Sequence, residues 1–402
     1  MSSLAEAQEP TSLRTLLDET RTRSPTLHAA RARVRAARAA LAAAGWPQDP
    51  MAEVEADRLR PWGPGDEEVM IAYRLLQPLP IPGQLGLEER VARAAEDRSQ
   101  DDLETAFFDV ELLTTRAFLM LRRVDGELAV NDSQKQIVED LIGAALAWMR
   151  AGGDTHHDVV QSQVELLTLE SERTALAAER AAAVAMVNAL RDRPPQTAII
   201  AGEIGLLPES LLPAATLERM AIARRSELRS MRSMAREERA MAALMRREAW
   251  PMLRVGVWYN QMLRMPDSAG VMVGGNLPLF GVPRQSARAA QADARASAVE
   301  AERAGMRAMI RSQVRAARER YLATTQRLHL VRDVAIPRAE EVLVAAHSAY
   351  RAATTAFASV VQDRRTLSEL RMELVRLEFE AALAWAELLR QVGAGSLPEA
   401  EP

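Results

Sequence analysis

Two long stretches of the chain carry apolar residues at every third or fourth position, the spacing that lines one side of an α-helix. They cover residues 84–150 and 284–350, and Pro337 is the only proline inside either stretch. With a rise of 1.5 Å per residue, each stretch predicts a helix roughly 100 Å long. A compact core cannot cover helices of this length, so we expect them to pack against other helices.

Four shorter segments alternate between apolar and polar residues, as β-strands with two different faces do. We predict two hairpins, formed by residues 51–59 with 68–77 and by residues 252–260 with 269–277. The first strand has an acidic face, with Glu53, Glu55 and Asp57. The third strand has an apolar face, with Leu253, Val255, Val257 and Tyr259.

Strands of this length and alternation are typical of transmembrane β-barrels. Four strands cannot close a wide barrel, so a barrel would require several chains. Two hairpins alone would be marginal in water and would leave open edges. The alternative interpretation is a soluble helical coiled-coil scaffold, or interaction protein, in which the strands form a small β cap.

The chain also contains two copies of one unit. The stretch "RAGGDTHHDVVQ" (150–161) returns 201 residues later as "RAATTAFASVVQ" (351–362), and "PMAEV" returns at the same offset as "PMLRV". This offset holds without gaps from residue 50 to 170 of the first copy. We infer a tandem duplication, with one repeat over residues 1–201 and the second over residues 202–402.

Each repeat has the same predicted order of helix, strand hairpin, long helix, tip turn and return helix. In the first repeat these elements are residues 25–45, 51–77, 84–150, 151–155 and 155–191. In the second repeat they are residues 216–248, 252–277, 284–350, 351–356 and 356–391. Ser24 is the expected N-cap of the first helix and Pro25 its first residue.

Composition narrows the function classes. The chain has no cysteine, which excludes disulfides and thiolate metal sites, and its net charge of -4 gives no electrostatic footprint for nucleic acid. No Ser-His-Asp set, phosphate loop or His-rich ligand spacing is present, so we expect no enzyme and no cofactor. The start "MSSLAEAQEP" lacks the regions of a secretory signal, so the chain either stays in the cytosol or has lost its signal.

The order of elements resembles that of the TolC-like outer-membrane factors of tripartite efflux pumps and type I secretion systems. "SPTLHAARARVRAARAALAAAGWPQDP" looks like the first helix of this family, and "LLQPLPIPGQLGLEERVARAAED" like its strand-to-helix exit. "VMVGGNLPLFGVPRQSARAAQADARA" is similar to the second exit and "YRAATTAFASVVQ" to the second tip. The resemblance covers about residues 12–391.

The resemblance implies a mainly α fold with a small β part. Duplicated long-helix hairpins would form an α-helical barrel, and the four strands of each chain would contribute to a trimeric, twelve-stranded transmembrane β-barrel. The implied function is a passive export conduit from the periplasm to the exterior, gated at the periplasmic helix tips. Its implied partners are two further copies, outer-membrane lipid, a periplasmic adaptor and an inner-membrane transporter. The "PIPGQ" exit resembles heavy-metal-type members, which favours metal-ion or small-molecule efflux.

The resemblance also points to a gate at the tips. Aligned on the following "DVVQ", Asp158 occupies the place of a family gate aspartate, and three copies on one axis would form an acidic ring that favours cations. In the second repeat the corresponding places hold Ser359 and Gln362, with Asp363 one residue beyond. The alternative is that Asp154 caps the return helix and Asp158 is a surface carboxylate.

Other tip residues are expected to form the turns and to contact the adaptor: Gly152, Gly153, His156, His157, Ala353 and Thr354. Adjacent residues on a helix point about 100° apart, so the two histidines do not converge on one metal ion. We interpret them as solvated tip residues and predict no metal site. The methionines of residues 252–265 are interpreted as packing, with soft-metal contact as the alternative.

Overall fold

The computed structural model describes residues 11–57, 70–150, 156–203, 207–262, 265–276, 278, 280–352, 354–355 and 357–395. The chain forms two compact units, and each takes segments from both halves of the sequence. Unit 1 consists of Met1–Ala29, Thr105–Arg225 and Ala308–Pro402, and unit 2 consists of Ala30–Glu104 and Ser226–Arg307. The division into repeats at residue 201 stays a prediction.

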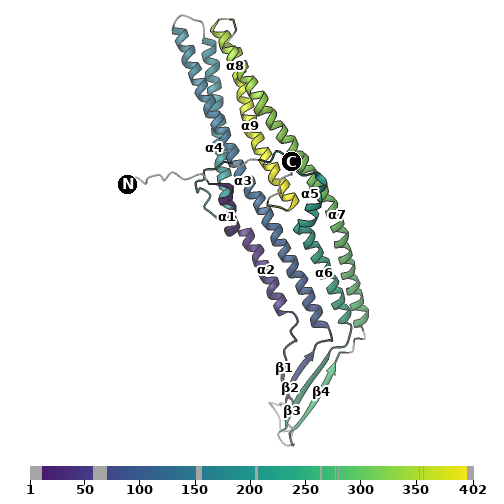
Figure 1. Cartoon of the computed structure of the whole chain (residues 1–402). Coiled ribbons are helices and arrows are strands. Elements are labelled where there is room, and N and C mark those ends of the chain that lie inside the picture. The colour runs from purple at the N-terminus through teal and green to yellow at the C-terminus, as the bar shows by residue number, and fades with distance from the viewer. Residues whose placement is uncertain are drawn as a thin grey trace, which may run out of the picture. The chain divides into compact units, whose positions relative to one another are not determined.

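Helices make up most of the described chain (Figure 1). Unit 1 contains α1 (Leu13–Arg23), α4 (His156–Leu190), α5 (Ala214–Arg224), the π-helix η1 (Leu330–Ala335), α8 (Ile336–Arg351) and α9 (Phe357–Val392). Unit 2 contains β1 (Met51–Asp57), β2 (Met70–Leu79), α6 (Ser226–Arg247), β3 (Leu253–Met262) and β4 (Ser268–Gly275). Three helices continue from one unit into the other: α2 (Pro25–Ala43), α3 (Gln84–Arg150) and α7 (Gly281–His329).

Helix α3 is continuous over 67 residues and covers the range that the hydrophobic spacing predicts. The sequence had not indicated α1 as a separate element. Its N-cap is Ser12, whose hydroxyl oxygen accepts a hydrogen bond of 3.1 Å from the backbone N–H of Thr15. Ser24 lies between α1 and α2, and its carbonyl accepts the backbone N–H of His28 at 3.0 Å.

The predicted single helix over residues 216–248 is wrong. It is two helices, α5 and α6, separated by Arg225, whose backbone is extended with φ -63 and ψ 120. The side chain of Arg225 turns inward and is 8% exposed. Its guanidinium donates to the side-chain oxygens of Gln313 at 3.3 Å and Gln391 at 3.0 Å. In a straight helix the side chain of Arg225 would point in another direction.

The predicted helix over residues 284–350 is helical throughout, but a π-turn interrupts it and divides it into α7, η1 and α8. Pro337 stands in the first turn of α8, directly after the π-helix. Proline has no N–H to donate, and in an α-helix its ring collides with the carbonyl four residues earlier. A wider π-turn moves that carbonyl away from the ring, which explains the interruption at this place.

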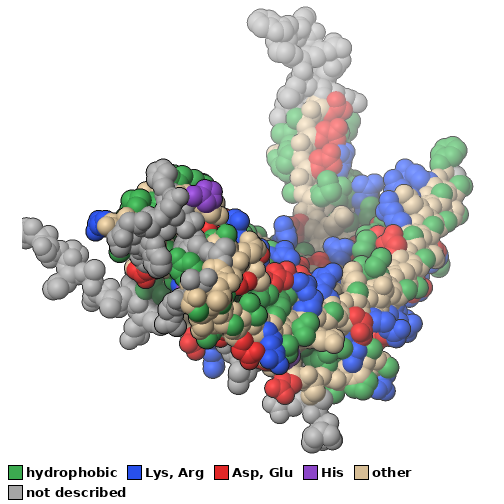
Figure 2. Space-filling view, turned by 90° about the horizontal axis from the view of Figure 1, so that it is seen from above, with side chains coloured by type: hydrophobic (Ala, Val, Ile, Leu, Met, Phe, Trp, Pro, Cys, Tyr) green, Lys and Arg blue, Asp and Glu red, His purple; other side chains and the backbone are tan. Residues whose placement is uncertain are grey.

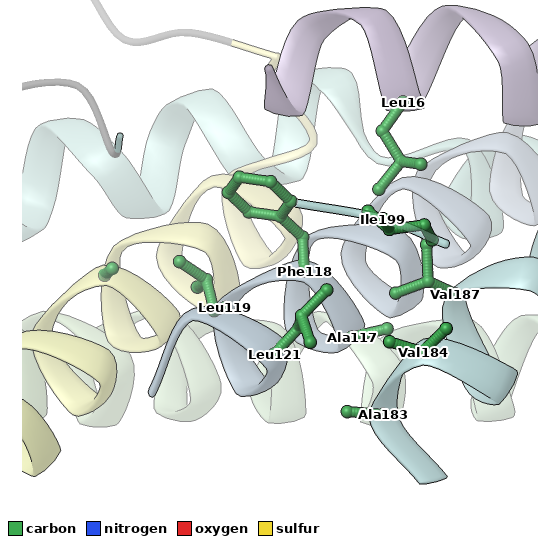
Figure 3. Close-up of a cluster of buried hydrophobic side chains, with 10 residues drawn as sticks. Leu16, Ala117, Phe118, Leu119, Leu121, Ala183, Val184, Val187 and Ile199 are labelled. Carbon is green, nitrogen blue, oxygen red and sulfur yellow. The ribbon is translucent and has the colours of Figure 1, made fainter. Parts of the chain in front are cut away.

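The core of unit 1 includes a cluster of buried side chains from α1, α3, α4, α9 and the segment after α4 (Figure 3). Leu16 points from α1 toward Ile199, and Val187 of α4 lies on the other side of Ile199. Phe118 and Leu121 of α3 are 1% and 0% exposed in the same cluster. Burying a Leu or Phe side chain stabilises a fold by about 1.5 to 3 kcal/mol, so this cluster fastens the middle of α3 to its neighbours.

The strands of unit 2 form one antiparallel sheet in the order β1-β2-β3-β4. Strand β2 pairs with β3, from Met70 opposite Met262 to Leu79 opposite Leu253, so the two predicted hairpins join into a single sheet. The predicted strand ends at residues 58–59, 68–69 and 277 lie outside the described residues. None of the helices in the described part of the chain combines the length and the apolar character needed to cross a membrane.

Candidate functional site

The sheet has one apolar face, and that face is exposed. The strand register places ten large apolar side chains on it, and each of them is exposed in the chain: Val54, Tyr73, Leu75, Leu79, Leu253, Val255, Val257, Tyr259, Val271 and Val273. The exposed fraction reaches 66% at Val54, 53% at Val257 and 83% at Val271. Soluble monomers rarely expose apolar surface on this scale, so this face marks a surface for lipid or for another protein.

The opposite face of the sheet is mixed, with charged side chains on β1 and at Arg74 beside apolar ones such as Leu76 and Met272. Arg74 of β2 donates to Glu55 of β1 at 2.5 Å and lies 3.8 Å from Glu53. On the neighbouring strands the indole of Trp258 lies across Gly270, where an added Cβ would come within 2.7 Å of the ring. The sheet therefore separates an apolar face from a face that can meet water, as the alternation predicted.

Two edges of the sheet are open within the part of the chain that the structure describes. Strands β1 and β4 are the outer strands of the order, so each has one side without a partner in this sheet. An exposed edge presents unpaired N–H and C=O groups and is a template for a strand from another chain. The sheet is thus suited to continuation by further strands at both ends.

The first hairpin tip is described in part. Asp158 and His156 belong to the first turn of α4, and His157 in the same turn is exposed. The positions of Gly152, Gly153 and Asp154 lie outside the described residues.

The second hairpin tip has a defined helix end. The backbone N–H and the hydroxyl of Thr354 donate to the carbonyl of Ala349, at 2.9 and 3.0 Å, and close the C-terminal turn of α8. Ala353 lies outside the described residues. Ser359 and Gln362 are exposed and Asp363 is half-buried, all within the first two turns of α9.

Ion pairs and hydrogen bonds connect the two helices of each hairpin. Between α3 and α4, Lys135 lies 3.0 Å from Glu170 and Arg173 lies 2.8 Å from Asp132. Between α8 and α9, Glu340 and Arg371 lie 2.9 Å apart. Charged side chains of both signs are interspersed on the face of the molecule shown in Figure 2, in keeping with the small net charge of -4.

A second set of contacts connects the two hairpins. Arg364 of α9 donates to the carbonyl of Ile137 of α3 at 3.5 Å. Burial lowers the pKa of the Arg364 guanidinium, and the negative charge of Asp140, which raises this pKa, offsets only part of that effect. Deeper in unit 1, Glu127 of α3 has a side chain that is only 2% exposed. It accepts hydrogen bonds from Arg123 at 2.7 Å and from Arg376 of α9 at 2.9 Å.

Sequence reasoning missed the Glu127 cluster. Arg376 lies 249 residues away from Glu127 in the chain, so no local pattern connects them. The available signal was that Glu127 follows the buried positions Leu121 and Val124 at helical spacing, which places a carboxylate in the apolar stripe of α3. The hydrogen bond from Arg376 to this carboxylate raises the pKa of Arg376, with burial acting in the opposite direction.

No group of three or more His, Asp or Glu side chains that could hold a metal ion occurs in the described part of the chain. The described residues therefore present surfaces: a sheet with one apolar face and open edges, and two helical hairpins.

No protein-family model matches the sequence, and no curated protein matches it either. Solved structures do match. The outer membrane protein VceC from Vibrio cholerae is 16% identical, with a TM-score of 0.80 over 95% of this chain and 96% of VceC. The outer membrane channel CmeC from Campylobacter jejuni is 12% identical, with a TM-score of 0.81 over 98% of this chain and 91% of CmeC. The outer membrane channel MtrE from Neisseria gonorrhoeae, in its open state, is 14% identical, with a TM-score of 0.79 over 95% of this chain and 89% of MtrE.

The chain has the fold of an outer-membrane channel. The likeness extends over nearly the whole chain and nearly the whole of each channel, so the helical hairpins and the sheet are both part of it. The predicted fold class, mainly α with a small β part, is confirmed. At identities of 12 to 16% these comparisons show the channel fold and not the function.

Proposed function

We propose that the chain is one protomer of a trimeric outer-membrane channel that serves as the exit conduit of a tripartite efflux pump. The observation that carries the proposal is the sheet, because it combines an exposed apolar face, an opposite face with charged side chains and two open edges. The channel fold supports the same conclusion. No reaction is involved, and solutes pass from the periplasm to the exterior through the lumen.

The sheet would work as one third of a barrel. Strand β4 of one copy pairs with β1 of the next, which closes the edges and removes the unpaired backbone groups from lipid. The apolar face, with Val54, Val257 and Val271, then meets the hydrocarbon, while Arg74 and Glu55 line the water-filled lumen. A sheet closed in this way explains why large apolar side chains remain exposed in the single chain.

The helical hairpins would continue the lumen as a tunnel through the periplasm, with its gate at the hairpin tips. The proposed constriction is formed by Asp158 and Asp154 from the first tip and by Ser359, Gln362 and Asp363 from the second. Three copies of Asp158 give a ring of negative charge that favours cations and repels anions. Its repeat partner Ser359 is uncharged, so the charge of the gate rests mainly on the first tip.

The tips are also the proposed docking surface for a periplasmic adaptor, which connects the channel to an inner-membrane transporter. His157 and Thr354 are exposed there and can contact such a partner. The resemblance of the "PIPGQ" exit to heavy-metal-type members favours metal ions or small molecules as cargo.

The test is to produce the full-length chain with a secretory signal and to extract it from the outer membrane with detergent. We expect a particle with three times the mass of the 44.3 kDa chain and stepwise conductance after reconstitution in a planar bilayer. A monomer that remains in solution without detergent and gives no conductance would favour the soluble coiled-coil scaffold and overturn the channel.

A further inference from the structure

The π-helix η1 changes the side of the helix that packs inward. Along α7 the buried residues follow one regular spacing of three and four: Ile310, Val314, Ala317, Tyr321, Thr324 and Leu328. Continued without interruption, this spacing would bury Arg338, Val342 and Ala345 in α8, but all three are exposed. Their C-terminal neighbours Ala339, Leu343 and Ala346 are half-buried instead. The other half-buried residues of α8 are Ile336, His347, Ala349 and Tyr350.

One extra residue inserted into a helix shifts all later inward-facing positions by one residue, which is the shift observed here. The backbone N–H of Ile336 donates to the carbonyl of Val331, five residues earlier, which is the hydrogen bond of a π-turn. The long helix α3 shows that length alone does not require such a turn. One set of its buried residues keeps a single spacing through unit 1: Val110, Thr114, Ala117, Leu121, Val124, Asn131 and Val138. Phe118, Leu119 and Glu127 are buried beside this set.

Helix α8 is held weakly after the π-turn. No described side chain of Ile336–Tyr350 is buried, whereas Leu328 before the turn is 4% exposed and packs on Leu377 of α9. Among the ion pairs that connect this region to α9 are Arg332 with Glu378 at 3.6 Å and Glu340 with Arg371 at 2.9 Å. All four side chains are between 41% and 48% exposed, and ion pairs in contact with water contribute little stability.

The sequence of α8 offers a second inward face. Beside the observed set of Ala339, Leu343, Ala346 and Tyr350 runs a parallel set formed by Arg338, Val342, Ala345 and Ala349. Three of the four members of the second set are apolar, and Val342 is 52% exposed in the observed state. A rotation of α8 by one residue would therefore exchange one mostly apolar set for another.

We propose that η1 is a register switch. The helix can give up its π-turn by passing the extra residue toward the C-terminal end of α8, and α8 then turns by one residue against α9. Pro337 holds the π-turn in place, because the α-helical alternative brings its ring against the carbonyl of Asp333. The switch goes beyond the proposed channel function, and its consequence would be to turn the second hairpin tip.

Disulfide crosslinking can read the register, since the chain has no cysteine of its own. The ion pair of Glu340 with Arg371 places Leu343 and Ser368, three residues further along each antiparallel helix, at one level. The pair Leu343→Cys with Ser368→Cys reports the observed register, and Val342→Cys with Ser368→Cys reports the shifted one. Neighbouring positions on a helix point about 100° apart, so one register cannot serve both pairs equally well.

In the full-length chain we expect the pair at 343 and 368 to crosslink fast and the pair at 342 and 368 slowly. Pro337→Ala removes the residue that holds the π-turn, so it should raise the rate of the 342–368 crosslink severalfold. Deletion of Ala335 together with Pro337→Ala removes the extra residue and leaves a continuous helix in the observed register. That variant should lose the 342–368 crosslink and keep the one at 343 and 368.

The control is deletion of Ala316 together with Pro337→Ala, which moves the contacts of the buried residues from Ala317 to Leu328 by one residue and should lower the melting temperature. The variant with Ala335 deleted should melt close to the wild type. A 342–368 crosslink that is equal in all backgrounds, or absent from all, would overturn the switch. Equal loss of melting temperature in the two deletions would overturn the one-residue insertion. Crosslinking rates and melting temperatures are measured without a conducting channel. A negative result would therefore contradict the register switch without bearing on the proposed channel function.

Discussion

At the scale of single residues, the buried carboxylate of Glu127 shows how charge is kept inside a helical bundle. Arg123 and Arg376 both donate to it, but their surroundings differ, since their side chains are 16% and 55% exposed. Arg123 also bonds Glu179 of α4 and lies over the ring of Phe379, with 5.7 Å from its guanidinium carbon to the ring centroid. The two arginines therefore share one carboxylate partner but differ in exposure, so substituting each in turn compares a buried ion pair with an exposed one.

We predict that Arg123→Ala lowers the free energy of unfolding by about 3 to 5 kcal/mol, because the partner that it removes from Glu127 is itself mostly buried and also bonds Glu179. Arg376→Ala should cost about 1 kcal/mol or less, since its side chain is in contact with water. Denaturant unfolding in detergent measures both variants. Equal losses would show that burial of the arginine does not decide its contribution.

Glu19 of α1 gives a prediction about pH. Burial raises the pKa of its carboxyl, but hydrogen bonds and the charges of Arg191 and Arg193 outweigh burial and hold this pKa below the ordinary value of 4.5. A lowered pKa in the folded state stabilises the fold above the ordinary value, and this contribution is lost as the pH falls through the folded pKa. Glu19→Gln should cost about 1 to 2 kcal/mol at neutral pH.

Melting curves of Glu19→Gln and the wild type, recorded between pH 7 and pH 3, check this prediction. The difference between the two proteins should be constant above about pH 5 and should narrow below 4.5, where the wild-type carboxylate takes up a proton. A difference that grows on acidification would have the wrong sign for a carboxylate stabilised by two arginines.

At the scale of elements, the sequence pattern predicts those helices and strands whose stability depends on neighbouring residues along the chain. The range of α3 follows from an uninterrupted apolar spacing without proline, and the faces of β3 and β4 follow from alternation. The π-turn does not follow, because a single proline in a helical pattern predicts a kink or an end and not an inserted residue. The break at Arg225 depends on hydrogen bonds to Gln313 and Gln391, which lie far away in sequence.

The sheet allows a prediction in which one substitution is made on each face. Val257→Arg puts a charge on the exposed apolar face, which in lipid costs about 2 to 4 kcal/mol near the middle of the bilayer. Asn260→Arg, on the same strand but on the opposite face beside Ser268, should cost little. Membrane insertion measured by detergent-resistant trimer yield should fall for Val257→Arg alone, and equal yields would show that the apolar face does not meet lipid.

At the scale of the whole molecule, the order of the elements predicts the fold better than it predicts the site. Helix, hairpin, long helix and return helix occur twice along the sequence, and that order alone points to the channel fold that the solved structures confirm. The proposed gate depends on how three chains meet at the tips of the hairpins. Residues of one chain can indicate which charges are present at a tip, but the width of the opening is a property of the assembly.

The difference in charge between the two tips leads to a prediction for the assembled channel. If Asp158 forms a ring on the axis, Asp158→Ala removes three negative charges from the narrowest part of the lumen, so cation selectivity should fall. Ser359→Asp adds three charges at the equivalent place of the second tip and should raise cation selectivity. Reversal potentials in a salt gradient across a planar bilayer measure both changes. If Ser359→Asp alters the reversal potential while Asp158→Ala leaves it unchanged, the second tip lines the constriction and Asp158 is a surface carboxylate.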